Sequence, residues 1–185
     1  MLTDLDETLL HQAAATFDNT NISDHRFFDR MVVGFHKEDA ANVIMGLAKY
    51  KNMNTFEGFA CVQHGESQHN LRVARPLRPD VNDMVNGPVS IEFSEPLKSL
   101  RIKLDPGEHN TSFDVVYTGL TPPYEEGYHI ARSYGRLSQD YMRFDQVGVM
   151  NGWLDVGGEK MDVDNWYTFR DHSWGVRPGV GGFEP

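Results

Sequence analysis

The chain has 185 residues, of which 39% are hydrophobic and 24% charged, a composition typical of a folded globular protein. Seventeen Lys and Arg residues against 27 Asp and Glu residues give a formal net charge of -10. An acidic chain repels phosphate backbones and no basic block reverses that charge locally, so nucleic acid is excluded as an expected partner. The single cysteine, Cys61, excludes an intrachain disulfide.

The N-terminal region predicts a short helix followed by a loop. Residues 7–17 form the candidate helix, because Asp4 can cap its free backbone N–H groups and Glu7 follows at the capping-box spacing. Residues 19–30 are polar and lead into the body of the protein. The first residues lack the basic start and apolar core of a signal peptide, and no apolar run approaches the ~20 residues of a membrane span. We therefore expect a cytoplasmic protein with no membrane span.

From residue 31 onward the hydrophobic pattern takes a period of two, which is typical of β-strands. Residues 31–36 alternate in this way. Periodicity alone leaves residues 41–51 as a helix or a strand, but Val43 and Ile44, with Gly46 inside the run, favour a strand. Residues 56–63 and 68–75 predict two strands joined by a hairpin turn at 64–67.

The rest of the chain continues this pattern. Residues 89–94 and 100–104 each have one apolar and one polar face, as antiparallel strands do, and 95–99 is a turn of hairpin length. Pro106 and Gly107 end the second of these strands, and residues 113–117 form the next. After a loop at 121–127, residues 129–142 are ambiguous. The last strands are predicted at 144–153 and 156–163, which bracket the hairpin signal Gly157-Gly158, and at 166–174.

Short strands, frequent turn residues and few helices predict a mainly antiparallel all-β fold, either a sandwich or a barrel. The hairpins favour a barrel, since closure removes exposed sheet edges. We divide the chain into an N-terminal helix and lead-in loop at 1–30, a β-barrel domain at 31–177, and a Gly-rich tail or linker at 178–185.

The most distinctive stretch is Arg170-Asp171-His172-Ser173-Trp174-Gly175-Val176-Arg177, which follows Arg143-Phe144-Asp145-Gln146-Val147-Gly148 after one intervening hairpin. Together they resemble the end of the first domain in a superfamily that includes carotenoid hydratase (hydroxyneurosporene synthase), kievitone hydratase and, more distantly, tocopherol cyclase. Members have two consecutive lipocalin-like barrels, the first ending near a D-H-x-W-G signature. The resemblance implies a lipocalin/calycin-like barrel or half-barrel. This chain stops where a second barrel would begin, which fits either a half of a two-barrel protein or a standalone barrel.

The chemistry of this motif follows from strand geometry. Neighbouring residues point to opposite faces, so Asp171 and His172 cannot easily pair, whereas His172 shares a face with Trp174. In a hydratase of isolated double bonds an acid protonates carbon, and the developing cation needs a π-face or carboxylate nearby. His172 or Asp171 could be that acid, with Trp174 as the π-face. The structural alternative is a charged latch of Arg170, Asp171 and Arg177, with Trp174 plugging the barrel end.

Other constellations give weaker signals. His64 and His69 flank the 64–67 turn and could join His36 or His109 in a zinc site, but no spacing is diagnostic, so no metal is expected. Cys61 has apolar neighbours typical of an inert buried thiol. No nucleotide-binding or serine-hydrolase motif occurs.

The leading hypothesis is a barrel that binds a hydrophobic, isoprenoid-like or polyketide-like small molecule. As an enzyme it would be a cofactor-free hydratase or cyclase that uses acid catalysis. Asp171 and His172 are the candidate catalytic residues, and Trp174, Tyr117 and Trp166 are the candidate ligand contacts. The alternative is a non-catalytic lipid or metabolite carrier, or a structural half-barrel that acts when paired as a homodimer or with a second barrel domain.

Overall fold

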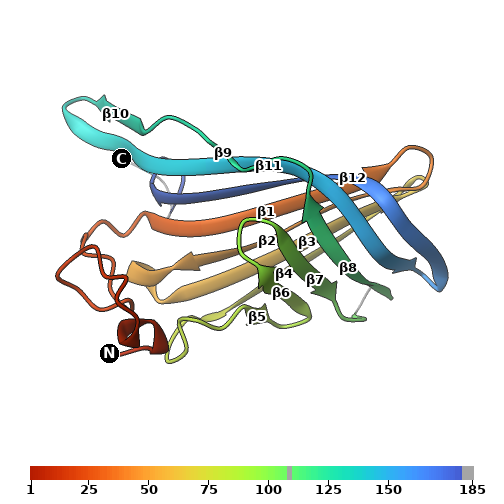
Figure 1. Ribbon diagram of the computed structural model, residues 1–185, viewed down its shortest axis with the longest axis horizontal. Coiled ribbons are helices and arrows are strands. Elements are labelled where there is room, and N and C mark those ends of the chain that lie inside the picture. Colours follow the sequence, from red (N-terminus) through yellow and green to blue (C-terminus); the bar gives the residue numbers. More distant parts are fainter. Residues whose placement is uncertain (108–109, 181–185) are drawn as a thin grey trace.

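One antiparallel sheet of 12 strands forms the body of the computed structural model, which describes residues 1–107 and 110–180 (Figure 1). The strands are β1 (Phe27–Lys37), β2 (Ala41–Tyr50), β3 (Thr55–His64), β4 (Ser67–Pro76), β5 (Val85–Asn86), β6 (Val89–Glu95), β7 (Ser99–Leu104), β8 (Thr111–Gly119), β9 (Tyr124–Glu125), β10 (His129–Ser133), β11 (Arg136–Val156) and β12 (Glu159–Val176). Their hydrogen-bonded order is β4-β3-β2-β1-β12-β11-β8-β7-β6-β5, and β9 and β10 both pair with β11. The first and last strands of the chain, β1 and β12, are therefore neighbours at the centre of the sheet.

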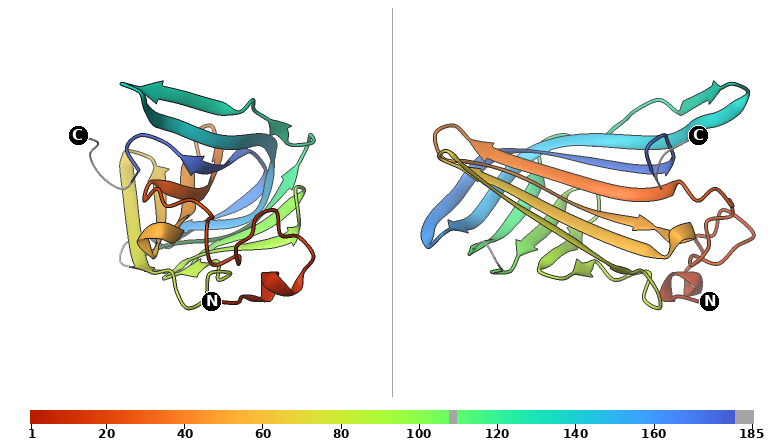
Figure 2. Two further views of the ribbon diagram at one scale, coloured as in Figure 1. Left: turned by 90° about the vertical axis from the view of Figure 1, so that its left-hand side faces the viewer. Right: turned by 180° about the vertical axis from the view of Figure 1, so that it is seen from behind.

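The sheet curls until its two edges approach each other, which makes a nearly closed barrel (Figure 2). Two side-chain contacts bridge the edges. Arg75 Nη2 of β4 donates to the carbonyl of Val85 in β5 at 3.0 Å, and Asn86 Nδ2 donates to the carbonyl of Phe56 in β3 at 2.8 Å. Asn86 is buried, so this bond satisfies a polar group that the core would otherwise leave without a partner. The predicted antiparallel, lipocalin-like all-β barrel is thus confirmed.

The core lies inside the barrel and is built by the alternation seen in the sequence. On β1, Val33 and Phe35 face inward and are fully buried, whereas His36 is exposed. The Phe35 ring meets the Phe113 ring of β8 edge-on at 5.6 Å, so the core connects opposite walls. Each large apolar side chain buried in this way stabilises the fold by roughly 1.5–3 kcal/mol.

The hairpin of β11 and β12 is the longest unit, with strands of 21 and 18 residues joined at Gly157-Gly158 (Figure 1). The hairpin at this position is confirmed. The predicted separate strands at 156–163 and 166–174 are one continuous strand in the structure. A register shift between Met150 and Gly152 and a positive φ of 52° at Asn165 mark the point where the pattern breaks without ending the strand.

The predicted N-terminal helix at residues 7–17 is wrong. Residues 4–7 form a single 3-10 turn, η1 (Asp4–Glu7), and residues 8–26 run as turns and bends up to β1. The Asp6 carboxylate accepts hydrogen bonds from the backbone N–H groups of Thr3 at 2.6 Å and Phe17 at 2.9 Å, which folds the segment back on itself. A helix of that length has little stability of its own in water, so these tertiary contacts decide the conformation.

Three other expectations can be compared with the structure. Residues 41–50 form β2, so the choice of a strand over a helix is confirmed. The ambiguous region 129–142 contributes β10 and the start of β11. Of the predicted tail at 178–185, residues 181–185 lie outside the described residues. No helix in the described part of the chain is long and apolar enough to cross a membrane.

Candidate functional site

A pocket of about 390 Å³ opens at the end of the barrel where β1 and β3 begin and β2 and β12 finish. We call it the end pocket. Its wall is mostly apolar and includes Met31, Leu47, Phe56, Val81, Met84 and Phe93. A few polar groups converge on this apolar surface, namely Asp29, Lys49, Lys51, Asn82 and His172. An apolar cavity of this size with a small number of placed polar groups is typical of a small-molecule site.

His172 and Asp29 form a pair in the end pocket. In the sheet register His172 lies opposite Met31, and Asp29 lies opposite Trp174, so both side chains point into the barrel from neighbouring strands. His172 Nε2 and Asp29 Oδ1 are 2.8 Å apart. The ring centroids of Phe144 and Trp174 each lie 5.3 Å from that of His172, with their planes steeply inclined to it. The arrangement gives a proton-transfer group with a carboxylate on one side and aromatic rings on the others.

Lys49 lies directly opposite Asp29 in the β1–β2 register and faces the same pocket. Its ammonium donates to the carbonyl of Val81 at 2.8 Å and lies 5.4 Å from the centre of the Phe56 ring. Burial lowers the pKa of the Lys49 ammonium to about 8, because the apolar surroundings disfavour the charged form. At pH 7 the group therefore keeps its proton.

Arg170 lies two residues before His172 on the inner face of β12 and is 1% exposed. Its Nε and Nη2 donate to Oε1 of Gln146 at 2.8 and 2.6 Å. The guanidinium is held between the rings of Tyr117 and Phe144, each 5.2 Å away. Burial lowers the pKa of Arg170, and no carboxylate in the described part of the chain forms an ion pair with it. A charged side chain thus lies in the barrel interior directly behind Phe144.

Asp171 points to the opposite face of β12, outside the barrel. Its carboxylate accepts hydrogen bonds from Arg143 Nη1 and from the Ser173 hydroxyl, both at 3.3 Å. Arg143 also donates to both carboxylate oxygens of Glu126 at 2.6 and 2.7 Å. The hydrogen bond from Arg143, followed by that with His129, lowers the pKa of Glu126 to about 2. Asp171 belongs to this outer charged cluster, and the structure does not bring it together with His172.

The three predicted ligand contacts lie at different depths. Trp174 is 37% exposed at the mouth, beside His172. Tyr117 is fully buried under Arg170, and its hydroxyl donates to the carbonyl of Val147 at 3.3 Å. Trp166 is buried farther along β12, where its ring lies 6.2 Å from that of Phe35. Of these three residues, none is part of the end-pocket wall, although Trp174 contacts His172, which is.

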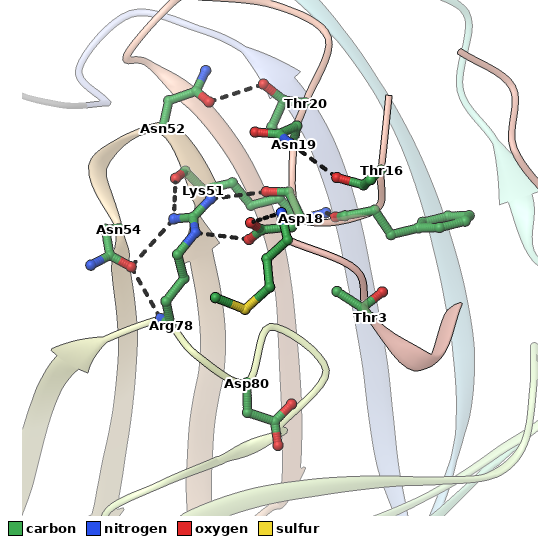
Figure 3. Close-up of polar contacts among 12 residues, drawn as sticks. Thr3, Thr16, Asp18, Asn19, Thr20, Lys51, Asn52, Asn54, Arg78 and Asp80 are labelled. Carbon is green, nitrogen blue, oxygen red and sulfur yellow. Dashed lines mark hydrogen bonds and ion pairs between the residues drawn. The ribbon is translucent and has the colours of Figure 1, made fainter. Parts of the chain in front are cut away.

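The N-terminal segment covers one side of the end pocket with Leu5 and Phe17. Figure 3 shows the polar contacts that hold this segment around Asp18. The guanidinium of Arg78 forms an ion pair with Asp18 at 2.8 Å and donates to the backbone carbonyl of Asp18 at 2.9 Å. The ammonium of Lys51 donates to the carbonyl of Phe17 at 2.8 Å. The cover is therefore fixed by polar contacts at its rim and contributes apolar side chains to the pocket.

The histidine pairings do not form a metal centre in the described residues. His64 contacts the carbonyl of Ala40 at 2.9 Å and Glu159 at 3.3 Å through its two ring nitrogens. Within residues 1–107 and 110–180, no group of three or more His, Cys, Asp or Glu side chains is arranged to hold an ion. His109 lies outside the described residues.

The sequence singles out His172, which the structure places in the end-pocket wall, and Trp174, which contacts it, but Asp29 and Lys49 were not among the candidates. A signal was present for Asp29, because it shares the period-two register of Met31 and Val33 and so falls on an inward position. An acidic residue at an inward position needs a partner, and that requirement was the available clue. Lys49 carried a comparable signal, since it shares the period-two register of Val43 and Leu47, and only its position opposite Asp29 depends on the register with β1.

The fold and the end pocket define a lipocalin-like β-barrel with a ligand-sized apolar site. The chain belongs to a family of unknown function, DUF8625, whose model matches residues 2–183. Among solved structures it is similar to kievitone hydratase from Nectria haematococca, with a TM-score of 0.56, 15% identity, and coverage of 83% of this chain and 49% of that chain. This chain thus spans about half the length of that structure, and the likeness shows a shared fold. The search of curated proteins found no match.

Proposed function

We propose that the end pocket binds a hydrophobic small molecule, isoprenoid-like or polyketide-like, and that the protein adds water to a double bond of this ligand or cyclises it without a cofactor. The observation that carries the proposal is the 2.8 Å pair of His172 and Asp29 inside an otherwise apolar pocket. The fold shared with a solved hydratase supports the choice of reaction. The name of that neighbour applies to that protein, and for this chain the reaction is our proposal.

The proposed chemistry uses one proton that leaves and returns. The His172 imidazolium donates a proton to one carbon of the double bond, and positive charge develops on the neighbouring carbon. Water attacks that carbon, and its surplus proton passes back to the neutral His172 imidazole, so the net change is addition of one water. In a cyclisation, a second double bond attacks instead and a carbon-bound proton returns to His172. The Asp29 carboxylate and the rings of Phe144 and Trp174 stabilise the charged states.

Asp171 takes a different part in this proposal. Its carboxylate lies on the outer face, where it contacts Arg143 and Ser173. We assign it as a positioning residue that fixes the end of β12, and therefore the direction of the His172 side chain. Trp174 is the proposed ligand contact at the mouth. Tyr117 and Trp166 would contact only a ligand that extends past Arg170 into the barrel.

The test begins with organic extraction of the purified protein, mass spectrometry of the extract, and a denatured control. A stoichiometric apolar compound is expected, and its alkene-containing precursors then serve as substrates. His172→Ala should abolish turnover, and Asp171→Asn should reduce kcat while leaving a measurable rate. His36→Ala is the matched control, since His36 is exposed on β1 and stacks on Tyr167 on the outer surface. Folded His172→Ala protein with wild-type turnover contradicts the assignment.

A carrier or a structural half-barrel is the second candidate, and it rests on a separate observation. Tyr167, Phe169 and Val147 are exposed apolar side chains on the outer face of β11 and β12. Apolar groups gathered on one face are typical of a surface that another protein covers. Size-exclusion chromatography with light scattering tests pairing with a second copy. A monomer that carries ligand but catalyses nothing supports a carrier.

The proposed cytoplasmic location is a separate expectation, and fractionation of cells tests it.

A further inference from the structure

Lys49 is a charged group of the end pocket that the proposed reaction leaves unused. It faces the pocket from β2, opposite Asp29, but the Asp29 carboxylate contacts His172 instead. An ammonium has three N–H donors, and the structure gives Lys49 one acceptor, the carbonyl of Val81 at 2.8 Å. Among the described residues, no carboxylate lies within ion-pair distance of its Nζ. The ammonium thus has donors to spare on the pocket side.

A charged amine in an apolar wall is costly to keep. Transfer of an ammonium out of water is unfavourable unless an oppositely charged or polar group compensates for the lost hydration. Within the described residues, the direct contacts of the ammonium are one carbonyl and the face of Phe56, with its ring centre 5.4 Å away, and nearby carboxylates act on it only beyond ion-pair distance. Burial accordingly lowers the pKa of Lys49 to about 8. A side chain needed only for packing at this position would be better served by Met or Leu.

We propose that Lys49 binds an anionic oxygen of the ligand, so that the end pocket selects an apolar molecule carrying one acidic group, such as a carboxylate, phenolate or enolate. This inference rests on the proposed function only in taking the end pocket as the ligand site. A charge-assisted hydrogen bond to such an oxygen supplies the partner that the protein itself does not.

The placement of Lys49 also fixes how the ligand lies. β2 and β12 are separated by β1, so the backbone positions of Lys49 and His172 are two strand spacings apart across the sheet, roughly 10 Å, and are offset by two residues along it. A ligand anchored at Lys49 by its acidic group presents a different part of its skeleton to His172, since both side chains line the same pocket from separate strands. Lys49 is therefore a specificity-determining residue, and the acidic group and the reacting bond lie at opposite ends of the bound part of the ligand.

Charged groups on several elements around Lys49 influence the pKa of its ammonium. The carboxylates of Asp29, Asp80 and Asp83 favour the protonated form, and the ammonium of Lys51 disfavours it. Lys51 is itself committed to the carbonyl of Phe17. Other titratable or charged groups on the elements that surround the pocket include His172 on β12, Arg75 on β4, the Arg78–Asp18 pair at the rim, and Asp6 and His11 in the N-terminal segment.

The test compares two fluorescent probes of nearly equal shape. 1-Anilinonaphthalene-8-sulfonate carries one anionic group, and N-phenyl-1-naphthylamine is the same skeleton without it. Lys49→Met should weaken binding of the anionic probe by about tenfold to a hundredfold and change binding of the neutral probe by less than about twofold. Lys49→Arg should retain most of the affinity for the anionic probe. The control is Lys103→Met, which should match the wild type for both probes. Lys103 lies on β7, and its ammonium is 3.8 Å from the carboxylate of Asp105.

The pH dependence gives a second readout. In the wild type, affinity for the anionic probe should fall as the pH rises through about 8, while affinity for the neutral probe stays constant. In Lys49→Met both should be constant over this range. Equal losses for the two probes, or no loss for the anionic one, would overturn the role of Lys49 while leaving the pocket in place. Failure of both probes to bind folded wild-type protein would instead refute the end pocket as a ligand site.

Discussion

His172 and Asp29 are 143 residues apart in the sequence, and their side chains meet at 2.8 Å. They meet because β1 and β12 are neighbours in the sheet, with the two residues at adjacent inward positions of one register. The pair of His172 and Asp29 is thus created by the pairing of β1 with β12 at the centre of the sheet, which brings the start of the barrel beside its end.

The first prediction concerns this pair. In a double-mutant cycle, Asp29→Ala and His172→Ala should show a coupling free energy of roughly 0.5–1 kcal/mol, because both side chains remain partly accessible to water. Urea unfolding of the wild type, both single variants and the double variant measures it. Strictly additive losses would mean that the pair does not form in solution.

A second prediction concerns Lys49 and the stability of the fold. Burial lowers its pKa from 10.5 to about 8, so between these pH values the unfolded chain binds more protons and stability rises with pH. The penalty is present in full below pH 8. Lys49→Met removes it and should stabilise the protein at pH 7 by about 1–2 kcal/mol, less than the shift alone implies because the carbonyl of Val81 loses its donor. Thermal unfolding at pH 7 and above pH 10 tests this, and destabilisation at pH 7 contradicts it.

Arg170 gives a third prediction, based on two replacements at one site. Arg170→Ala should cost about 3–5 kcal/mol, because it leaves a cavity between Tyr117 and Phe144 and removes the donors to Gln146. Arg170→Met should cost clearly less, because it fills the same space and removes a buried charge that has no carboxylate partner. Chemical denaturation of the two variants gives the comparison. Equal losses would show that the bonds to Gln146, rather than packing, dominate.

The N-terminal cover gives a fourth prediction. Burial raises the pKa of Asp6, but hydrogen bonds from Thr3, His11 and Phe17 outweigh it and hold the pKa well below 3.8. A lowered carboxyl pKa contributes stability that is present above the unfolded value and lost as the pH falls further. Asp6→Ala should therefore loosen the cover and speed dissociation of N-phenyl-1-naphthylamine, measured by stopped flow. The wild type should approach the variant below about pH 4, and identical rates at pH 7 would argue against the cover.

The sequence predicted the strands well and the site only in part. Alternation along β1, β6 and β7 is enough to place their inner faces, because a one-residue slip would move every apolar side chain to the solvent. The same parity correctly placed His172 and Trp174 on one face and Asp171 on the other. Parity marks Asp29 and Lys49 as inward positions but cannot say which strands are neighbours, and so the contact of Asp29 with His172 could not be predicted. The prediction of an N-terminal helix was wrong because the Asp6 carboxylate accepts a hydrogen bond from the backbone N–H of Phe17. That contact between residues 11 positions apart holds the segment in a folded-back loop.

The last prediction explains the glycine of the Asp171–Gly175 motif. Gly175 has a φ of 130°, and a Cβ there would lie 2.3 Å from the carbonyl oxygen of Asp140 and 2.6 Å from Cα of Tyr141. Both are backbone atoms of β11, which cannot move aside as a flexible side chain could. Gly175→Ala should therefore destabilise the fold by about 2–4 kcal/mol and disturb the end of β12, on which His172 lies three residues earlier. Gly157→Ala is the matched control, since its φ is also positive, at 66°, but its Cβ would meet nothing within 4 Å. That variant should cost only about 1 kcal/mol. Denaturation with both variants separates close backbone contact from φ strain alone, and equal losses would show that the approach of β11 at Gly175 is unimportant.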